Sequence, residues 1–264
     1  MGEVRIAMVR ADFGCGVLTG GNGGFGEVSE GIDYLANSVG ADVIMIGKSF
    51  NTEDDADQVD AHVKNLTSDF EAHPDVLFVV AGANDRADCD DANIFCWPAN
   101  NEASNTLRVL ATGVDWEGGD PETMTGEWEE ADTRPDDGLL KGTDHGSQTF
   151  NLAAPGFLYF DWVDNGSGGY KPEFTFGLNL LKFGSASNGY RGWDPTESTI
   201  SGGQSLSMAL VAGAAGLTKS ACPTLSGADL ADALLESAET SPPASTRTED
   251  DRYLDVAGAV SCTP

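Results

Sequence analysis

An alternation of short apolar runs with helical patterns constrains the fold of this chain more than any other feature. Four apolar runs predict β-strands: residues 4–10, 42–46, 76–81 and 107–112. After the first of these runs, residues 27–39 carry apolar side chains at helical spacing, and Gly40 follows where a helix C-terminus is expected. Because helices that connect parallel strands cover the faces of the sheet, the sequence predicts a three-layer α/β fold with a mainly parallel sheet.

The C-terminal third contains the most apolar helical pattern of the chain. Residues 205–217 are small and apolar nearly all round, which predicts a buried helix. Ser226 and Asp229 resemble a capping box at the start of the next helix. Other predicted elements are helices over 59–70, 228–238 and 254–260 and a short strand near 150–153. The length of 264 residues and the absence of a long polar tract predict a single domain over 1–264.

The charge of the chain excludes some classes of partner. There are 43 acidic and 14 basic residues, which give a formal net charge of −29. Nucleic acids and anionic membrane surfaces would be repelled, and no run of 18 apolar residues predicts a membrane span. Two interpretations of the acidity stay open: adaptation to concentrated salt, or calcium binding in acidic loops such as Asp161, Asp164 and Asn165. Apart from that calcium, we expect no cofactor and no metal.

The five cysteines favour an oxidising compartment. Cys89 and Cys96 flank a short acidic loop that a disulfide would close, and Cys222 is a candidate partner of Cys262, which leaves Cys15 odd. The first residues contain no basic segment followed by a long apolar stretch, so we expect no signal peptide in this chain. Disulfides persist outside the cytosol, so we expect the parent protein to be secreted or extracellular.

Ser205 is the first candidate for chemistry, because it lies at the start of the apolar helix. Free backbone N–H groups and the helix dipole favour negative charge at that position, so a serine there can attack a carbonyl group while N–H groups hold the oxyanion. The alternative is an ordinary capping serine. A G-x-S-x-G hydrolase is excluded, because its histidine follows the serine, whereas all three histidines here precede Ser205: His62, His73 and His145.

Six blocks, in order, resemble the subtilisin-like serine proteases. Residues 203–213 resemble the block G-T-S-M-A-x-P-x-V-A-G, which carries the family's nucleophile, and residues 78–85 resemble the strand that ends in A-A-G-N. The other four blocks are G-A-D-V-I-N-M-S-x-G at 40–50, Y-P-A at 97–99, V-D-L-A-A-P-G at 150–156 and the closing helix at 253–260. The resemblance implies a subtilisin-like serine hydrolase that cleaves acyl bonds in peptides or small esters.

Carried over residue by residue, the resemblance implies roles for five residues. Ser205 would be the nucleophile, and the Asn84 side chain would donate to the oxyanion. Ser49, Phe50 and Gly82 would hold the substrate.

The chain also departs from the family pattern. The family's catalytic Asp and His precede the strand that residues 4–10 resemble, so we expect an N-terminally truncated version of the fold. Ala209 stands in place of the family's proline and Gln204 in place of its threonine, and Gly47 with Lys48 interrupts the substrate edge.

The missing base leaves several hypotheses open. His145 is the first replacement candidate and Lys48 the second. The chain would otherwise be a catalytically silent binding or structural domain, or it would need a partner chain that supplies Asp and His. An uncovered sheet edge would favour self-association.

Overall fold

The computed structural model describes residues 5–9, 25–47, 49–52, 66–85, 87–112, 143–156, 160–164, 170–174, 204–240 and 248–261. The helices described are α1 (Phe25–Asp33), η2 (Tyr34–Val39), α3 (Gln204–Ala221), α4 (Gly227–Ser237), η5 (Glu249–Asp251) and α5 (Val256–Ala259), with a further helical segment at 66–71. The strands are β1 (Val43–Met45), β2 (Phe50–Thr52), β3 (Leu77–Ala81), β4 (Phe95–Trp97), β5 (Thr106–Thr112), β6 (Leu152–Pro155), β7 (Phe160–Asp164), β8 (Tyr170–Phe174), β9 (Glu239–Thr240) and β10 (Arg252–Tyr253). Among these described helices, none combines the length and apolar character that crossing a bilayer requires.

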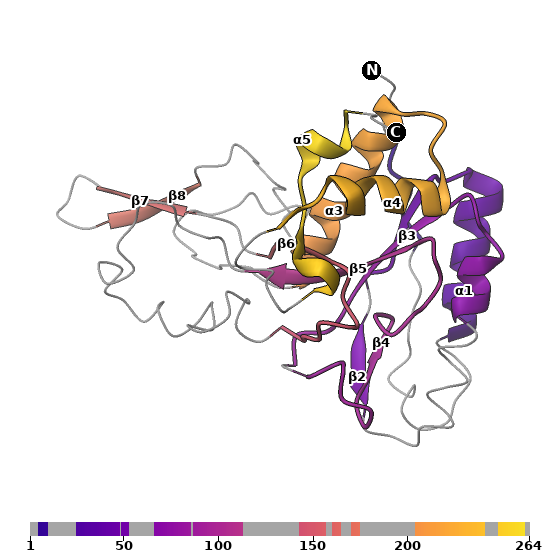
Figure 1. Ribbon diagram of the computed structural model, residues 1–264, viewed down its shortest axis with the longest axis horizontal. Helices are drawn as coiled ribbons and strands as arrows, with labels where there is room; N and C mark the ends of the chain where they lie inside the picture. The colour runs from indigo at the N-terminus through magenta and orange to yellow at the C-terminus, as the bar shows by residue number, and fades with distance from the viewer. Residues whose placement is uncertain are drawn as a thin grey trace, which may run out of the picture.

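A mostly parallel sheet forms the centre of the molecule (Figure 1). Its six strands lie in the order β1-β3-β5-β6-β10-β9, and only the last pair is antiparallel. The β1 and β3 strands lie within the runs predicted from the sequence, and β5 begins one residue before its run. The central strand β3 is buried at every residue, as expected for a strand covered on both faces. The predicted α/β class with a mainly parallel sheet is therefore confirmed.

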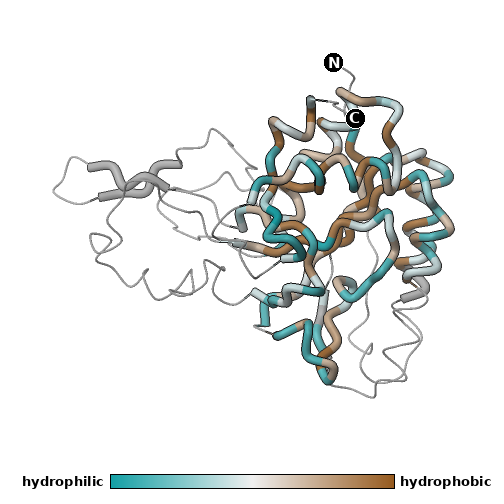
Figure 2. Tube along the Cα trace, in the orientation of Figure 1, coloured by the Kyte–Doolittle hydropathy of each residue, from teal (hydrophilic) through white to brown (hydrophobic). Residues whose placement is uncertain are grey.

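Helices cover both faces of this sheet, as the alternation along β3 shows. Leu77 and Val79 pack in the cluster formed with α3 and α4, whereas Phe78 and Val80 pack in a second cluster that includes α1 residues and Phe70. In Figure 1 α3 and α4 lie on one side of the sheet and α1 on the other, and in Figure 2 brown, apolar segments run through the centre. Successive side chains of a strand point to opposite faces, so one fully apolar run builds both cores.

Helix α3 is buried on one face, not all round as its composition predicts. Its buried residues recur at helical spacing: Gln204, Ser207, Met208, Val211, Ala214, Ala215 and Thr218. Leu217 is 52% exposed on the other face. Small side chains such as alanine and glycine tolerate exposure at little cost, so an apolar composition alone does not separate a one-sided helix from a buried one.

The strand predicted at residues 4–10 does not form over its described part, residues 5–9. Ile6 is 91% and Met8 90% exposed, so these apolar side chains lie in no core. A strand needs a neighbouring strand for its backbone hydrogen bonds, and no described strand pairs with this segment. The apolar pattern of residues 4–10 alone was therefore insufficient to predict a strand.

The ends of the chain's helices show a second difference from the sequence prediction. Ser226 is the N-cap residue of α4, but its side chain makes no capping bond, and its hydroxyl contacts Asp75 at 3.5 Å instead. The predicted capping box is therefore wrong. The C-terminus of the first helical segment follows the prediction, since Gly40 adopts a left-handed conformation with φ 71°.

Candidate active site

The start of α3 lies at the carboxyl edge of the parallel sheet. Two hydrogen bonds fix it there: the backbone N–H of Ala111 donates to Gln204 Oε1 at 2.7 Å, and Ser207 Oγ donates to the carbonyl oxygen of Ala154 at 3.0 Å. Ala111 and Ala154 lie near the ends of β5 and β6, which are parallel neighbours. In open α/β sheets this edge is where ligands bind, so Ser205, one residue after Gln204, is well placed for chemistry.

The structure brings the two main candidate residues together. The backbone N–H of Gln204 donates to Asn84 Oδ1 at 3.1 Å, so Asn84 lies directly beside the first turn of α3. Asn84 and Ser205 are both exposed. Because the Asn84 oxygen accepts from Gln204, the Nδ2 group is the donor that this side chain has left. The Ser205 hydroxyl forms no hydrogen bond to another described residue, so it is available to a ligand.

A buried carboxylate holds the loop that carries Asn84. Asp144 has 0% exposure, and it accepts backbone hydrogen bonds from Ala83, Asp85 and Ala87 and a side-chain bond from Asn51. The N–H groups of residues 83 and 85 flank Asn84 directly. Thr143, the residue before Asp144, is also buried, with 1% exposure.

Two glycines allow the segments around the site to approach closely. A Cβ atom at Gly82 would lie 2.9 Å from Phe150 Cζ and 3.0 Å from Asp144 Cβ. A Cβ atom at Gly156 would lie 2.5 Å from the Cβ atom of Ala111. Gly82 is itself buried. Its observed role is close packing below the Asn84 loop, and its contact with substrate stays a prediction.

The other predicted substrate residues lie on a separate two-stranded ribbon. Ser49 is half-buried just before β2, and Phe50 pairs with Trp97 in the antiparallel register of β2 with β4. Asn51, the next residue of β2, donates to Asp144 at 3.0 Å, which ties this ribbon to the Asn84 loop. The ribbon therefore adjoins the site, and the substrate contacts of residues 49 and 50 stay a prediction.

The structure joins no base to Ser205 within the residues it describes. His145 is half-buried, its Nδ1 atom is buried without a hydrogen-bond partner, and no hydrogen bond links its side chain to Ser205. A histidine base needs a second group that fixes its tautomer and orientation, and none is in place here. Lys48, the other candidate, lies outside the described residues.

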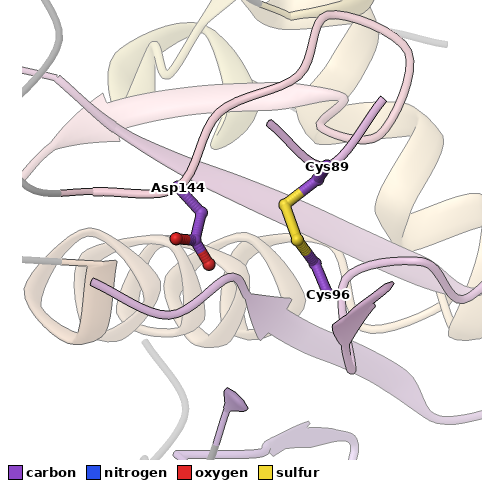
Figure 3. A group of neighbouring side chains, drawn as sticks. All are labelled: Cys89, Cys96 and Asp144. Atoms are coloured by element: carbon purple, nitrogen blue, oxygen red, sulfur yellow. A yellow bond between two sulfur atoms is a disulfide. The ribbon is translucent and has the colours of Figure 1, made fainter. Parts of the chain in front are cut away.

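A cluster of potential metal ligands lies beside this site, but its cysteines are oxidised. The ligand atoms of Cys89, Cys96 and Asp144 lie within 4.8 Å of one another, and Figure 3 shows the two sulfur atoms joined. A metal requires the thiolate form, which a disulfide does not provide, so this cluster fits no metal. The disulfide predicted between these cysteines is confirmed.

The structure describes only some of the residues in the remaining predictions, those on the other cysteines and on calcium. Cys222 is disulfide-bonded as well, but its predicted partner Cys262 lies outside the described residues. Of the acidic loop considered for calcium, Asp161 and Asp164 lie in β7, and Asn165 lies outside the description. Calcium binding there stays a prediction.

The mostly parallel sheet with helices on both faces defines an α/β fold, and Asn84 and Ser205 lie close together at its carboxyl edge. The family model of the subtilases, peptidase family S8, matches residues 3–258. The chain belongs to the subtilase family, a family of serine peptidases. A search of curated proteins found no significant sequence match.

Solved structures of subtilisin-like proteins share this fold. A subtilase cytotoxin SubAB structure aligns with a TM-score of 0.59 at 19% identity, over 91% of this chain and 66% of the other. The A-subunit of the AB5 toxin from E. coli gives 0.58 at 19% identity, over 91% and 68%, and a lanthipeptide protease gives 0.57 at 16% identity, over 90% and 66%. The chain therefore spans about two thirds of the length of these structures.

Sequence reasoning missed the two residues that hold the site together. From the sequence alone Asp144 has no assigned role, and Gln204 is only a departure from the family's threonine. Gln204 is 1% exposed, and its side chain bonds both Ala111 and the carbonyl oxygen of Asp144. The one available signal was the position of a long polar side chain directly before the candidate nucleophile, at the start of an apolar helix.

Proposed function

We propose that the chain is a serine hydrolase that cleaves acyl bonds, in peptides or small esters, with Ser205 as the nucleophile. The observation that carries the proposal is the hydrogen bond from the Gln204 N–H group to Asn84 Oδ1, which orients the Asn84 amide beside the serine. Membership of the subtilase family supports the same chemistry.

In the proposed reaction Ser205 Oγ gives its proton to water and attacks the carbonyl carbon of the substrate. Negative charge develops on the carbonyl oxygen, where Asn84 Nδ2 and the Ser205 backbone N–H donate hydrogen bonds. The tetrahedral intermediate then expels the alkoxide or phenolate leaving group, and water hydrolyses the acyl-serine, which releases the acid and restores Ser205. Donors that are fixed before the reaction stabilise this charge without reorganisation, and the dipole of α3 acts in the same direction. An oxyanion site without a complete triad retains about 10³- to 10⁴-fold catalysis over water in a related serine enzyme. Activated esters, whose leaving groups need no proton, are therefore the expected substrates of the chain alone.

A fluorophosphonate probe tests whether Ser205 is activated. We expect mass spectrometry to locate the adduct on Ser205 in the wild type and to find none in Ser205→Ala. Ser226→Ala is the matched control, since Ser226 lies at the N-terminus of α4 but is no candidate nucleophile. Equal lack of labelling in wild type and Ser205→Ala would contradict the proposal and would support a catalytically silent binding domain.

A second candidate function is a partner-dependent enzyme, in which another polypeptide supplies the base and its orienting acid. One observation favours it: no described base is hydrogen-bonded to Ser205, and the Nδ1 atom of His145 has no partner. General acid–base catalysis contributes about 10²- to 10⁴-fold, so a polypeptide with the family's Asp and His blocks should raise ester turnover by that order. An unchanged rate with a bound partner would contradict this candidate.

We also propose that the parent protein works outside the cell in concentrated salt. The net charge of −29 supports this proposal, because self-repulsion is screened within about 3 Å at 1 M salt. The disulfide Cys89–Cys96 supports the extracellular location. The midpoint of thermal unfolding should rise between 0.1 M and 2 M potassium chloride, and an unchanged midpoint would count against salt adaptation.

A further inference from the structure

We propose that Asp144 is the positioning residue of the oxyanion site: its buried carboxylate and its backbone carbonyl together fix Asn84 relative to the start of α3. The inference rests on the proposed function for its catalytic meaning. It assigns a role to a buried carboxyl group that the reaction itself does not use.

The hydrogen bonds of Asp144 form a closed ring that includes Asn84. Its carboxylate accepts the N–H groups of Ala83 and Asp85, the residues on either side of Asn84. Its carbonyl oxygen accepts Gln204 Nε2 at 3.0 Å, and the Gln204 backbone N–H donates to Asn84 Oδ1 at 3.1 Å. Both ends of the hydrogen bond that orients Asn84 are therefore held by the same residue.

The charge of Asp144 is stabilised by hydrogen-bond donors and not by a cation within the described structure. Asp144 Oδ1 accepts from Asp85 N, from Ala87 N and from Asn51 Nδ2, and Oδ2 accepts from Ala83 N. Hydrogen bonds to an ionised acceptor are stronger than neutral ones, and a buried carboxylate is stable only while they persist. The loop therefore cannot move away without leaving that charge unpaired.

An asparagine at position 144 breaks this arrangement with almost no change in volume. One of the two oxygens becomes an NH2 group, and on either side it faces backbone N–H groups that require an acceptor. We expect Asp144→Asn to lower kcat for p-nitrophenyl acetate by about 10²-fold, because a displacement of about 1 Å costs that much, and to change KM little. Control measurements of circular dichroism and the unfolding midpoint establish that the variant folds.

A double-mutant cycle separates positioning from a general structural role. If Asp144 acts through Asn84, the variant Asp144→Asn/Asn84→Ala should lose no more activity than Asn84→Ala alone. Two losses that multiply would overturn the proposal. If Asp144→Asn does not fold, Gln204→Met replaces it in the cycle, because this change removes the donor to the Asp144 carbonyl, together with the acceptor of the Ala111 N–H, without adding a buried charge.

Asp90→Asn is the matched control. Asp90 also collects hydrogen bonds from backbone and hydroxyl groups, namely those of Ser147, Gln148 and Thr149, but it makes none to the Asn84 loop. This variant should lower the unfolding midpoint and leave kcat within about two-fold. An equal loss of kcat in both variants would mean that Asp144 has no special role.

Amide hydrogen exchange tests the positioning without any use of activity. In Asp144→Asn the N–H groups of residues 83, 85 and 87 should exchange at least about ten-fold faster, while those of Val79 and Val80 in β3 stay protected. Unchanged exchange at 83, 85 and 87 would overturn the proposal. If the wild-type chain does not react with fluorophosphonate, the proposed function is refuted. The exchange measurement then still tests whether Asp144 holds the Asn84 loop in place.

Discussion

On the oxyanion side of this site three distant segments are bonded to one another, whereas on the proton-transfer side the candidate base has no described partner. Asn84, Asp144 and Gln204 form a continuous set of hydrogen bonds. His145, the neighbour of Asp144, has a buried Nδ1 atom without a hydrogen bond. Under the proposed function, the difference teaches that the groups proposed to stabilise charge are fixed by the fold, whereas the ring of the candidate base is not fixed by any described hydrogen bond.

The largest effect is expected at Asn84, on the side of the site where the hydrogen bonds are continuous. Asn84→Ala removes one oxyanion donor and should lower kcat for an activated ester by about 10²- to 10³-fold, with little change in KM. Steady-state kinetics against Asp90→Asn as control checks this. A loss of less than about three-fold would mean that the Asn84 side takes no part in charge stabilisation.

Removal of the disulfide Cys89–Cys96 tests both sides of the site together, because the loop that it closes contacts both Asp144 and His145. The Ala87 N–H donates to Asp144, and the backbone of residues 87–89 is paired with His145. The double variant Cys89→Ser/Cys96→Ser should lose about 2–3 kcal/mol of unfolding free energy, since the bridge closes a loop in the unfolded chain. Urea denaturation measures this, and an unchanged midpoint would show that the loop is held by its hydrogen bonds alone.

The smallest effect is expected at His145. Because no described group orients its ring, His145→Ala should leave ester turnover within about two-fold, whereas a general base contributes about 10²- to 10⁴-fold. His73→Ala is the matched control, since His73 bonds Asp33 at 2.8 Å elsewhere in the fold. A hundred-fold loss in His145→Ala, with none in His73→Ala, would identify His145 as the base and would contradict the difference drawn between the two sides of the site.

The sequence predicted the parts of the molecule that depend on local pattern. Strands β1, β3 and β5 follow from their apolar runs, and the proximity of Asn84 to the start of α3 follows from two short blocks. The strand at residues 4–10 failed because a strand depends on a neighbour that an apolar run does not specify. Asp144 was missed because its backbone donors lie 57 to 61 positions earlier in the chain and its side-chain donor Asn51 lies 93 positions earlier. The burial of one acidic residue in an acidic stretch cannot be predicted from the sequence, because it depends on N–H groups that only the tertiary structure brings together.

The most direct test of the central claim is a crystal structure of the chain after reaction with a fluorophosphonate. The account predicts phosphorus bonded to Ser205 Oγ, with the phosphoryl oxygen about 2.7–3.1 Å from both Asn84 Nδ2 and the Ser205 backbone nitrogen. An adduct whose phosphoryl oxygen points to solvent, with Asn84 turned away from it, would contradict the account.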